Sequence, residues 1–139
     1  MKILIVEPGK HPREAEIDGS LKSMQNIVGG RIEPFYPYGD PVALVCNDEG
    51  KMNGLPLNRA VRDVNGEIYE IMAGTFFVCG LGDDSFESLT TQQMETYRNK
   101  FHHPEAFAHI GGKVVVIPAD EIADTPHITH SGIDDFDGR

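Results

Sequence analysis

The sequence predicts an α+β fold: a mainly antiparallel sheet with two helices packed on one of its faces, followed by a flexible acidic C-terminal tail. Short apolar runs bounded by Gly, Pro and Asn turn signals recur along the chain, and two segments show helical spacing after a capping residue. Their order, strands, helix, strands, helix, strand, is typical of helices packed against an antiparallel sheet. The 139 residues suffice for one domain, placed at 1–118, with the tail at 119–139.

A hairpin and a helix are the first predicted elements. Residues 2–7 (KILIVE) and 14–18 (EAEID) are strand-like runs separated by Pro-Gly and His-Pro turn signals. Ser20 then occupies an N-cap position, the following apolar residues share one helical face, and Gly29 marks the end. These signals predict a short amphipathic helix after the hairpin.

Strands are predicted on both sides of a long middle stretch. Residues 31–47 indicate strand, proline-rich turn and strand, and Pro34 favours an edge strand because proline cannot donate to a sheet ladder. Asn65 and Gly66 form a strong two-residue hairpin signal, followed by a run too β-branched and aromatic for a helix. Gly74 within that run predicts a bulge or a close backbone approach.

The second helix carries the clearest local signal. Thr90 is an N-cap candidate with Gln93 three positions on, which together form a capping box. Met94, Tyr97 and Phe101 follow at spacings of three and four, so they are expected on one buried face.

The last predicted strand, residues 113–117, contains an unbroken Val run that favours burial on both faces. Beyond it the apolar residues thin out, which predicts the poorly ordered tail. Six of the 22 acidic residues lie in 119–139, opposed there by Arg139 alone. The net charge of −10 disfavours direct nucleic-acid binding and attraction to an anionic membrane surface, since both depend on Lys and Arg.

The expected location is the cytoplasm. No apolar run approaches the roughly 18 residues that a membrane span needs, and the N-terminal run is too short for a signal peptide. Cys46 and Cys79 both lie in apolar runs and lack a partner at metal-ligand spacing, so they are expected as buried free thiols.

No catalytic, cofactor or metal site is predicted. Gly80 and Gly82 follow an apolar strand as in a dinucleotide fingerprint, but the third glycine is missing and two Asp residues stand where phosphate would approach. The histidines at 102, 103, 109, 127 and 130 lack the spacing and the frame of a structural zinc site. We find no nucleophile elbow and no triad, and we expect a protein that is not an enzyme.

The stretch 46–63 (CNDEGKMNGLPLNRAVRD) is longer than an ordinary strand connection and concentrates cations and amides in an acidic chain. Arginine offers a planar fork that suits phosphate or carboxylate and can stack on a base. The alternative interpretation, given equal weight, is that Arg59 and Arg62 only form surface ion pairs with Asp63, Glu67 or Glu70. The candidate ligand-binding residues are Tyr36, Asn47, Lys51, Asn58, Arg59 and Arg62.

Four segments resemble one small family when taken together: VEPGK, EIDGSLKSMQNIVGG, DPVALVCNDEGKMNGLPLNRAV and AGTFFVCGLGDDSFESLT. The chain is similar over about residues 1–118 to the DUF3846 family of phages and mobile elements. The resemblance implies a small phage-encoded accessory protein in a bacterial host, and it carries over no catalytic residues. Its pattern NxEGK…GLPxNR falls on the stretch 46–63.

These observations favour a binding protein that sequesters a small anionic, nucleotide-derived host immune signal. Arg59 and Arg62 would hold phosphate, Asn47 and Asn58 would contact polar edges, and Tyr36 would stack. A homodimer or higher homo-oligomer is expected, because a chain of this size has limited room for a deep pocket. The alternative hypothesis is an acidic inhibitor or DNA mimic that engages a basic surface of a host nuclease or regulator.

Overall fold

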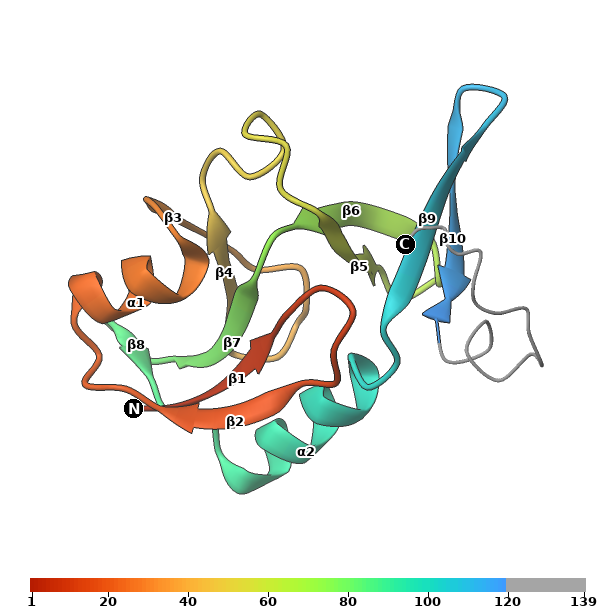
Figure 1. Ribbon diagram of the computed structural model, residues 1–139. Helices are drawn as coiled ribbons and strands as arrows, with labels where there is room; N and C mark the ends of the chain where they lie inside the picture. Colours follow the sequence, from red (N-terminus) through yellow and green to blue (C-terminus); the bar gives the residue numbers. More distant parts are fainter. Residues whose placement is uncertain (120–139) are drawn as a thin grey trace.

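In the computed structural model, which describes residues 1–119, the largest sheet has the strand order β2-β1-β7-β4-β3, and all neighbours are antiparallel (Figure 1). The short β8 also pairs with β7. The strands are β1 (Lys2–Val6), β2 (Arg13–Glu16), β3 (Ile32–Phe35), β4 (Val42–Asn47), β7 (Phe76–Leu81) and β8 (Phe86–Glu87). Pro34 lies in β3 at the end of this order, so its predicted edge position is confirmed.

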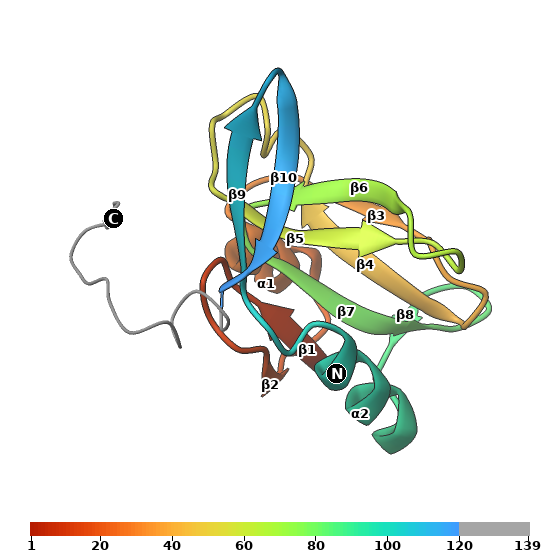
Figure 2. The same cartoon turned by 90° about the vertical axis from the view of Figure 1, so that its right-hand side faces the viewer.

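Two further hairpins lie outside the large sheet. One pairs β5 (Leu57–Arg62) with β6 (Ile68–Ala73), and its turn contains the predicted Asn65-Gly66 signal. The other pairs β9 (Glu105–Ile110) with β10 (Lys113–Pro118) and projects away from the large sheet in both views (Figures 1 and 2). The second half of the stretch 46–63 is therefore a strand and not part of a long loop.

Both predicted helices are confirmed with their caps. α1 (Leu21–Val28) begins after Ser20, whose side chain accepts from the Ser23 amide, and ends at Gly29 in the left-handed region. α2 (Thr91–Lys100) begins at the predicted capping box of Thr90 and Gln93, with both reciprocal hydrogen bonds present.

The helices cover opposite faces of the large sheet, so the prediction that both pack on one face was wrong. Met24 and Val28 of α1 pack with Ile3 and Ile5 of β1 and with alternate residues of β4 and β7. Leu4 of β1 faces the other way, toward a core that contains α2 and the β5–β6 hairpin. Because successive side chains of a strand point to opposite faces, the continuous apolar runs of β1, β4 and β7 require cover on both sides.

Two predictions about single segments have opposite outcomes. Gly74 has a φ of +80°, and a Cβ there would lie 2.7 Å from Leu55 Cδ1, so the predicted close approach is confirmed. The predicted burial of the Val run on both faces is wrong, because β10 forms an exposed hairpin with β9.

The predicted tail at 119–139 lies almost entirely outside the described residues. Within residues 1–119, no helix combines the length and apolar character that crossing a membrane requires.

Candidate anion-binding site

Asn58 and Arg59, two of the predicted ligand-binding residues, are buried on β5. The Asn58 amide nitrogen donates to the Val6 and Gly74 carbonyl oxygens, at 2.9 Å each. Its oxygen accepts from Arg59 Nη1 at 2.9 Å. The side chain thus joins β5 to the end of β1 and to the loop before β7.

The Arg59 guanidinium belongs to the same buried hydrogen-bond network as Asn58. Its Nε and Nη2 donate to the carbonyl oxygen of Phe101 at 3.1 and 2.9 Å, and Nη2 also donates to the Lys10 carbonyl oxygen at 2.6 Å. Only 1% of the residue is exposed. Arg59 therefore fastens the β1–β2 turn and the C-terminal end of α2 to β5, and its buried guanidinium donates to protein carbonyl groups.

Asn47 and Lys51 have local structural partners as well. Asn47 is buried, donates to the Val28 carbonyl oxygen at 3.1 Å and accepts from the Glu49 amide at 2.8 Å, which anchors the loop after β4. The Lys51 amine pairs with a carboxylate oxygen of Glu70. Both residues line a hollow other than the one that Arg62 lines, so the structure does not gather the predicted set at one site.

Tyr36 is 53% exposed and borders a different hollow, next to the loop at Gly82 and Asp83. Of the other candidates, Asn47 and Lys51 line one hollow and Arg59 and Arg62 line another, and of this second pair Arg62 is the exposed one. Arg62 has an ion-pair partner other than the three considered from the sequence: its Nη1 lies 3.4 Å from Glu105 Oε2 on β9.

We define the cationic hollow as the cavity of about 430 Å³ between the β5–β6 hairpin, the end of α2 and the ends of the β9–β10 hairpin. Arg62, Lys100 and His103 bring basic groups to it, and Arg59 lies beneath. Lys100 has no ion-pair partner within residues 1–119. The hollow is lined by Tyr38, Arg59, Ala60, Arg62, Asp63, Val64, Gly66, Lys100, Phe101, His103, Glu105 and Pro118.

The helix dipole and two acids bear on whether this hollow suits an anion. The C-terminal end of a helix carries partial negative charge, but the Phe101 carbonyl there already accepts two Arg59 hydrogen bonds. Glu105 is engaged by the Ala60 amide at 2.7 Å as well as by Arg62. The Asp63 carboxylate accepts from the amides of its own turn. The acids are thus largely satisfied by the protein.

Tyr38 supplies a hydroxyl without a hydrogen-bond partner in the part of the chain that the structure describes. Its oxygen is buried and forms no hydrogen bond with any described residue. The ring packs against Tyr97 at 5.4 Å between centroids, and the Lys100 amine lies 5.1 Å from its centroid. Burial raises the pKa of Tyr38, so the hydroxyl remains protonated and able to donate.

The sequence did not single out Lys100 or His103 as partners of Arg62. Tyr38 belongs to the aromatic segment PFYPY, which was considered for the same side as the arginines, whereas Lys100 ends α2 and His103 lies three residues beyond it. His11 also stacks on His102, with ring centroids 4.5 Å apart. Within residues 1–119, no His, Cys, Asp and Glu side chains group as a metal site would require.

The cysteines do not provide an activated nucleophile. Burial raises the pKa of the Cys79 thiol to about 12. Burial, together with the nearby carboxylates of Glu33 and Glu70, raises the pKa of Cys46 to about 11. Both are free thiols that stay protonated near neutral pH, and a thiolate is the reactive form.

The chain belongs to the family described as Domain of unknown function (DUF3846), whose model matches residues 1–102. The match includes Tyr38, Arg59, Arg62 and Lys100 but ends before the β9–β10 hairpin, short of the expected limit of the resemblance. No curated protein and no solved structure matches the chain.

Proposed function

We propose that this member of the DUF3846 family is a non-enzymatic binding protein that holds a small anionic, nucleotide-derived ligand in the cationic hollow. The observation that carries the proposal is the buried Tyr38 hydroxyl, which lacks an acceptor among the described residues and belongs to a ring whose centroid lies 5.1 Å from the Lys100 amine. A buried donor without a partner costs about 1–3 kcal/mol, and an anionic oxygen would supply the missing acceptor.

The size and chemistry of the hollow support the same ligand class. A volume of about 430 Å³ lies within the roughly 300–1,000 Å³ that small-molecule sites occupy. Lys100 and Arg62 offer charge-assisted donors for phosphate, and the Arg62 guanidinium plane offers a stacking surface for a base. This proposal does not include Asn47, Asn58 and Tyr36, which the sequence analysis predicted as ligand contacts.

The biological setting belongs to the proposal as well. The family resemblance implies a phage-encoded accessory protein, and the free thiols suit the cytoplasm of a bacterial host. There the chain would lower the free concentration of a nucleotide immune signal by holding it intact. The homo-oligomer expected from the sequence would multiply the number of sites per particle.

The experiment that tests this function recovers the ligand. The purified protein is incubated with extracts of bacteria whose nucleotide-signalling defences are active, washed and heat-denatured, and the released small molecules are identified by mass spectrometry. We expect one intact nucleotide per hollow from the wild type and almost none from Arg62→Ala/Lys100→Ala.

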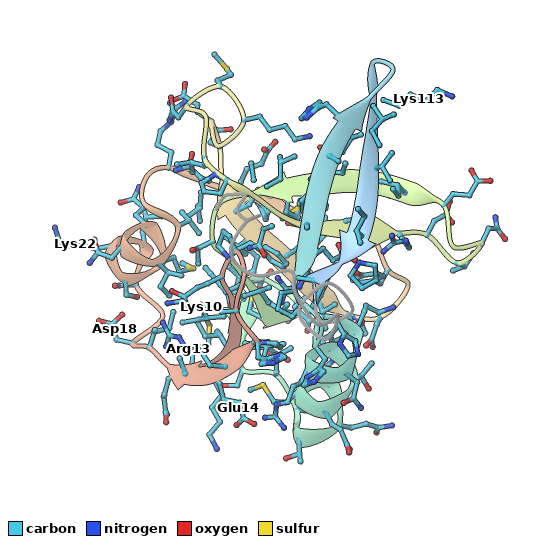
Figure 3. All side chains as sticks on the ribbon, turned by 45° about the vertical axis from the view of Figure 1, so that its right-hand side comes forward. Lys10, Arg13, Glu14, Asp18, Lys22 and Lys113 are labelled. Atoms are coloured by element: carbon cyan, nitrogen blue, oxygen red, sulfur yellow. The ribbon has the colours of Figure 1, made fainter. Side chains whose placement is uncertain are left out.

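The matched control is Lys22→Ala/Arg31→Ala, which removes the same two charges elsewhere. Lys22 lies on α1, far from the β9–β10 hairpin (Figure 3), and Arg31 pairs with Asp48 at 2.9 Å. This variant should release as much ligand as the wild type. Equal release from all three proteins, or none from the wild type, would overturn the proposal, and the latter result would favour the acidic inhibitor. Release of a chemically altered nucleotide would point to an enzyme.

A further inference from the structure

Both edges of the large sheet carry features that discourage pairing with another chain. β2 has the sequence REAE, with Arg13, Glu14 and Glu16 exposed. Figure 3 labels Arg13 and Glu14. β3 contains Glu33 and Pro34. Charged residues and proline are the usual means by which proteins protect the edges of a sheet.

β10 carries such residues only at its two ends. β9 contacts β5, so β10 is the outer strand of its hairpin and has no other strand beside it within residues 1–119. Residues 114–117 are Val-Val-Val-Ile, with Lys113 before them and Pro118 after them. Val114 and Val115 remain exposed, as does Ile110 near the tip of the hairpin.

The turn geometry fixes which backbone groups of β10 face outward. Ile110 and Lys113 face each other across the two-residue loop Gly111-Gly112, and both glycines have positive φ, as a type I′ turn requires. In such a turn the two flanking residues, here Ile110 and Lys113, form a hydrogen-bonded pair. Hydrogen-bonded and non-hydrogen-bonded pairs then alternate along the two strands. The amide groups of Lys113, Val115 and Ile117 therefore face β9.

A hydrogen bond at the far end of the hairpin agrees with this alternation. The Ala119 amide donates to the Pro104 carbonyl oxygen at 2.6 Å, so position 119 faces β9 as positions 113, 115 and 117 do. The N–H and C=O groups of Val114 and Val116 then point away from β9. Pro118 also falls on the outward side, where the N–H that it lacks is not needed.

We propose that β10 pairs antiparallel with β10 of a second copy of this chain, with Val115 opposite its own counterpart. In this register Val114 faces Val116 of the second copy, and the outward groups of these two residues form four hydrogen bonds across the two-fold axis. Lys113 faces Ile117, so no like charges oppose each other. The pairing converts two exposed two-stranded hairpins into one four-stranded sheet.

The strand itself favours a second copy over a different partner. Its apolar sequence is short, uniform and bracketed by Lys113 and Pro118, so it complements itself when turned by a two-fold rotation. An isolated two-stranded hairpin is marginally stable in water, and three or more strands are generally required. Because β10 ends at the rim of the cationic hollow, pairing would also place the second copy near that rim.

Sedimentation equilibrium of the full chain tests the oligomeric state. We expect a mass near twice 15.3 kDa for the wild type and a mass near 15.3 kDa for Val116→Pro. The proline removes an outward donor and leaves the hydrogen bonds to β9 in place. A melting curve establishes that the variant is folded.

A pair of cysteine variants tests the register without relying on the proline. Val114 and Val115 are 36% and 38% exposed, so Val114→Cys and Val115→Cys present matched thiols. Position 115 faces itself at a non-hydrogen-bonded pair, where the Cα separation of about 4.5 Å lies within disulfide range. After mild oxidation, non-reducing electrophoresis should show at least fivefold more covalent dimer for Val115→Cys than for Val114→Cys, and none for the wild type.

Three results would overturn the proposal. The first is a monomer at all concentrations with equal cross-linking of the two cysteine variants. The second is a dimer that is unaffected by Val116→Pro and cross-links equally through both positions, which would place the interface elsewhere. The third is a dimer that forms only after residues 120–139 are deleted, which would assign the β10 edge to that segment. The cationic hollow could bind its ligand in any of these cases.

Discussion

Replacing Arg59 with alanine is expected to lower the free energy of unfolding by about 3–4 kcal/mol. The substitution leaves the buried carbonyl oxygen of Phe101 and the partly buried one of Lys10 without these donors, each at a cost of about 1–3 kcal/mol, and also leaves a cavity. Small domains are stable by only about 5–15 kcal/mol, so much of the stability would be lost. Urea denaturation followed by circular dichroism measures the change.

Arg62→Ala is the matched control, because it removes the same side chain three residues along the same strand. Arg62 is exposed and its ion pair with Glu105 is at the surface, so we expect a loss of no more than about 1 kcal/mol. An Arg59→Ala variant as stable as Arg62→Ala would contradict the structural role of Arg59.

Ligand binding, unlike stability, should depend on the exposed cations of the hollow. We expect Arg62→Ala/Lys100→Ala to bind ADP, used as a probe, about 30-fold more weakly than the wild type, because two charge-assisted donors are lost from a partly solvated site. Tyr38→Phe, which removes only the hydroxyl, should weaken binding about fivefold. Isothermal titration calorimetry at low ionic strength measures both, and added salt should weaken wild-type binding.

Lys22→Ala/Arg31→Ala controls for the change in net charge and should bind ADP with wild-type affinity. If this variant loses as much affinity as Arg62→Ala/Lys100→Ala, the attraction reflects overall charge and not the hollow. Unchanged binding by Arg62→Ala/Lys100→Ala would place the ligand elsewhere.

Local signals in the sequence were sufficient for the helices and several turns. Ser20, Gly29 and Thr90 act within a few residues of their own positions, so their capping roles follow from the nearby sequence. The same holds for the turn at Asn65 and Gly66. Pro34 predicted an edge because the missing donor is a property of the residue itself.

The roles of Asn58 and Arg59 could not be predicted in this way. Their acceptors come from distant segments: Val6 is 52 positions from Asn58, and Phe101 is 42 from Arg59. The sequence of this strand, with an amide and two arginines, is also typical of a solvated loop. Only the tertiary structure shows that the acceptor carbonyl groups surround Asn58 and Arg59. The concentration of polar residues at 46–63 was real, but Asn47, Asn58 and Arg59 donate to backbone carbonyl groups of the fold.

The arrangement of the two helices on opposite faces of the sheet could have been predicted from the sequence. The apolar runs of β1, β4 and β7 indicate strands buried on both faces, which requires cover on each side. We applied that argument only to 113–117, where it failed, because Gly111 and Gly112 turn this run into the outer strand of a hairpin. The composition of a strand alone does not distinguish a buried strand from an exposed edge.

Backbone amide chemical shifts, recorded while ADP is titrated into ¹⁵N-labelled protein, test the central claim most directly. We predict that the largest shifts occur at Arg62, Asp63, Phe101 and His103, around the cationic hollow. Shifts confined to residues 47–56 or to the hollow beside Tyr36, with those four amides unmoved, would contradict it.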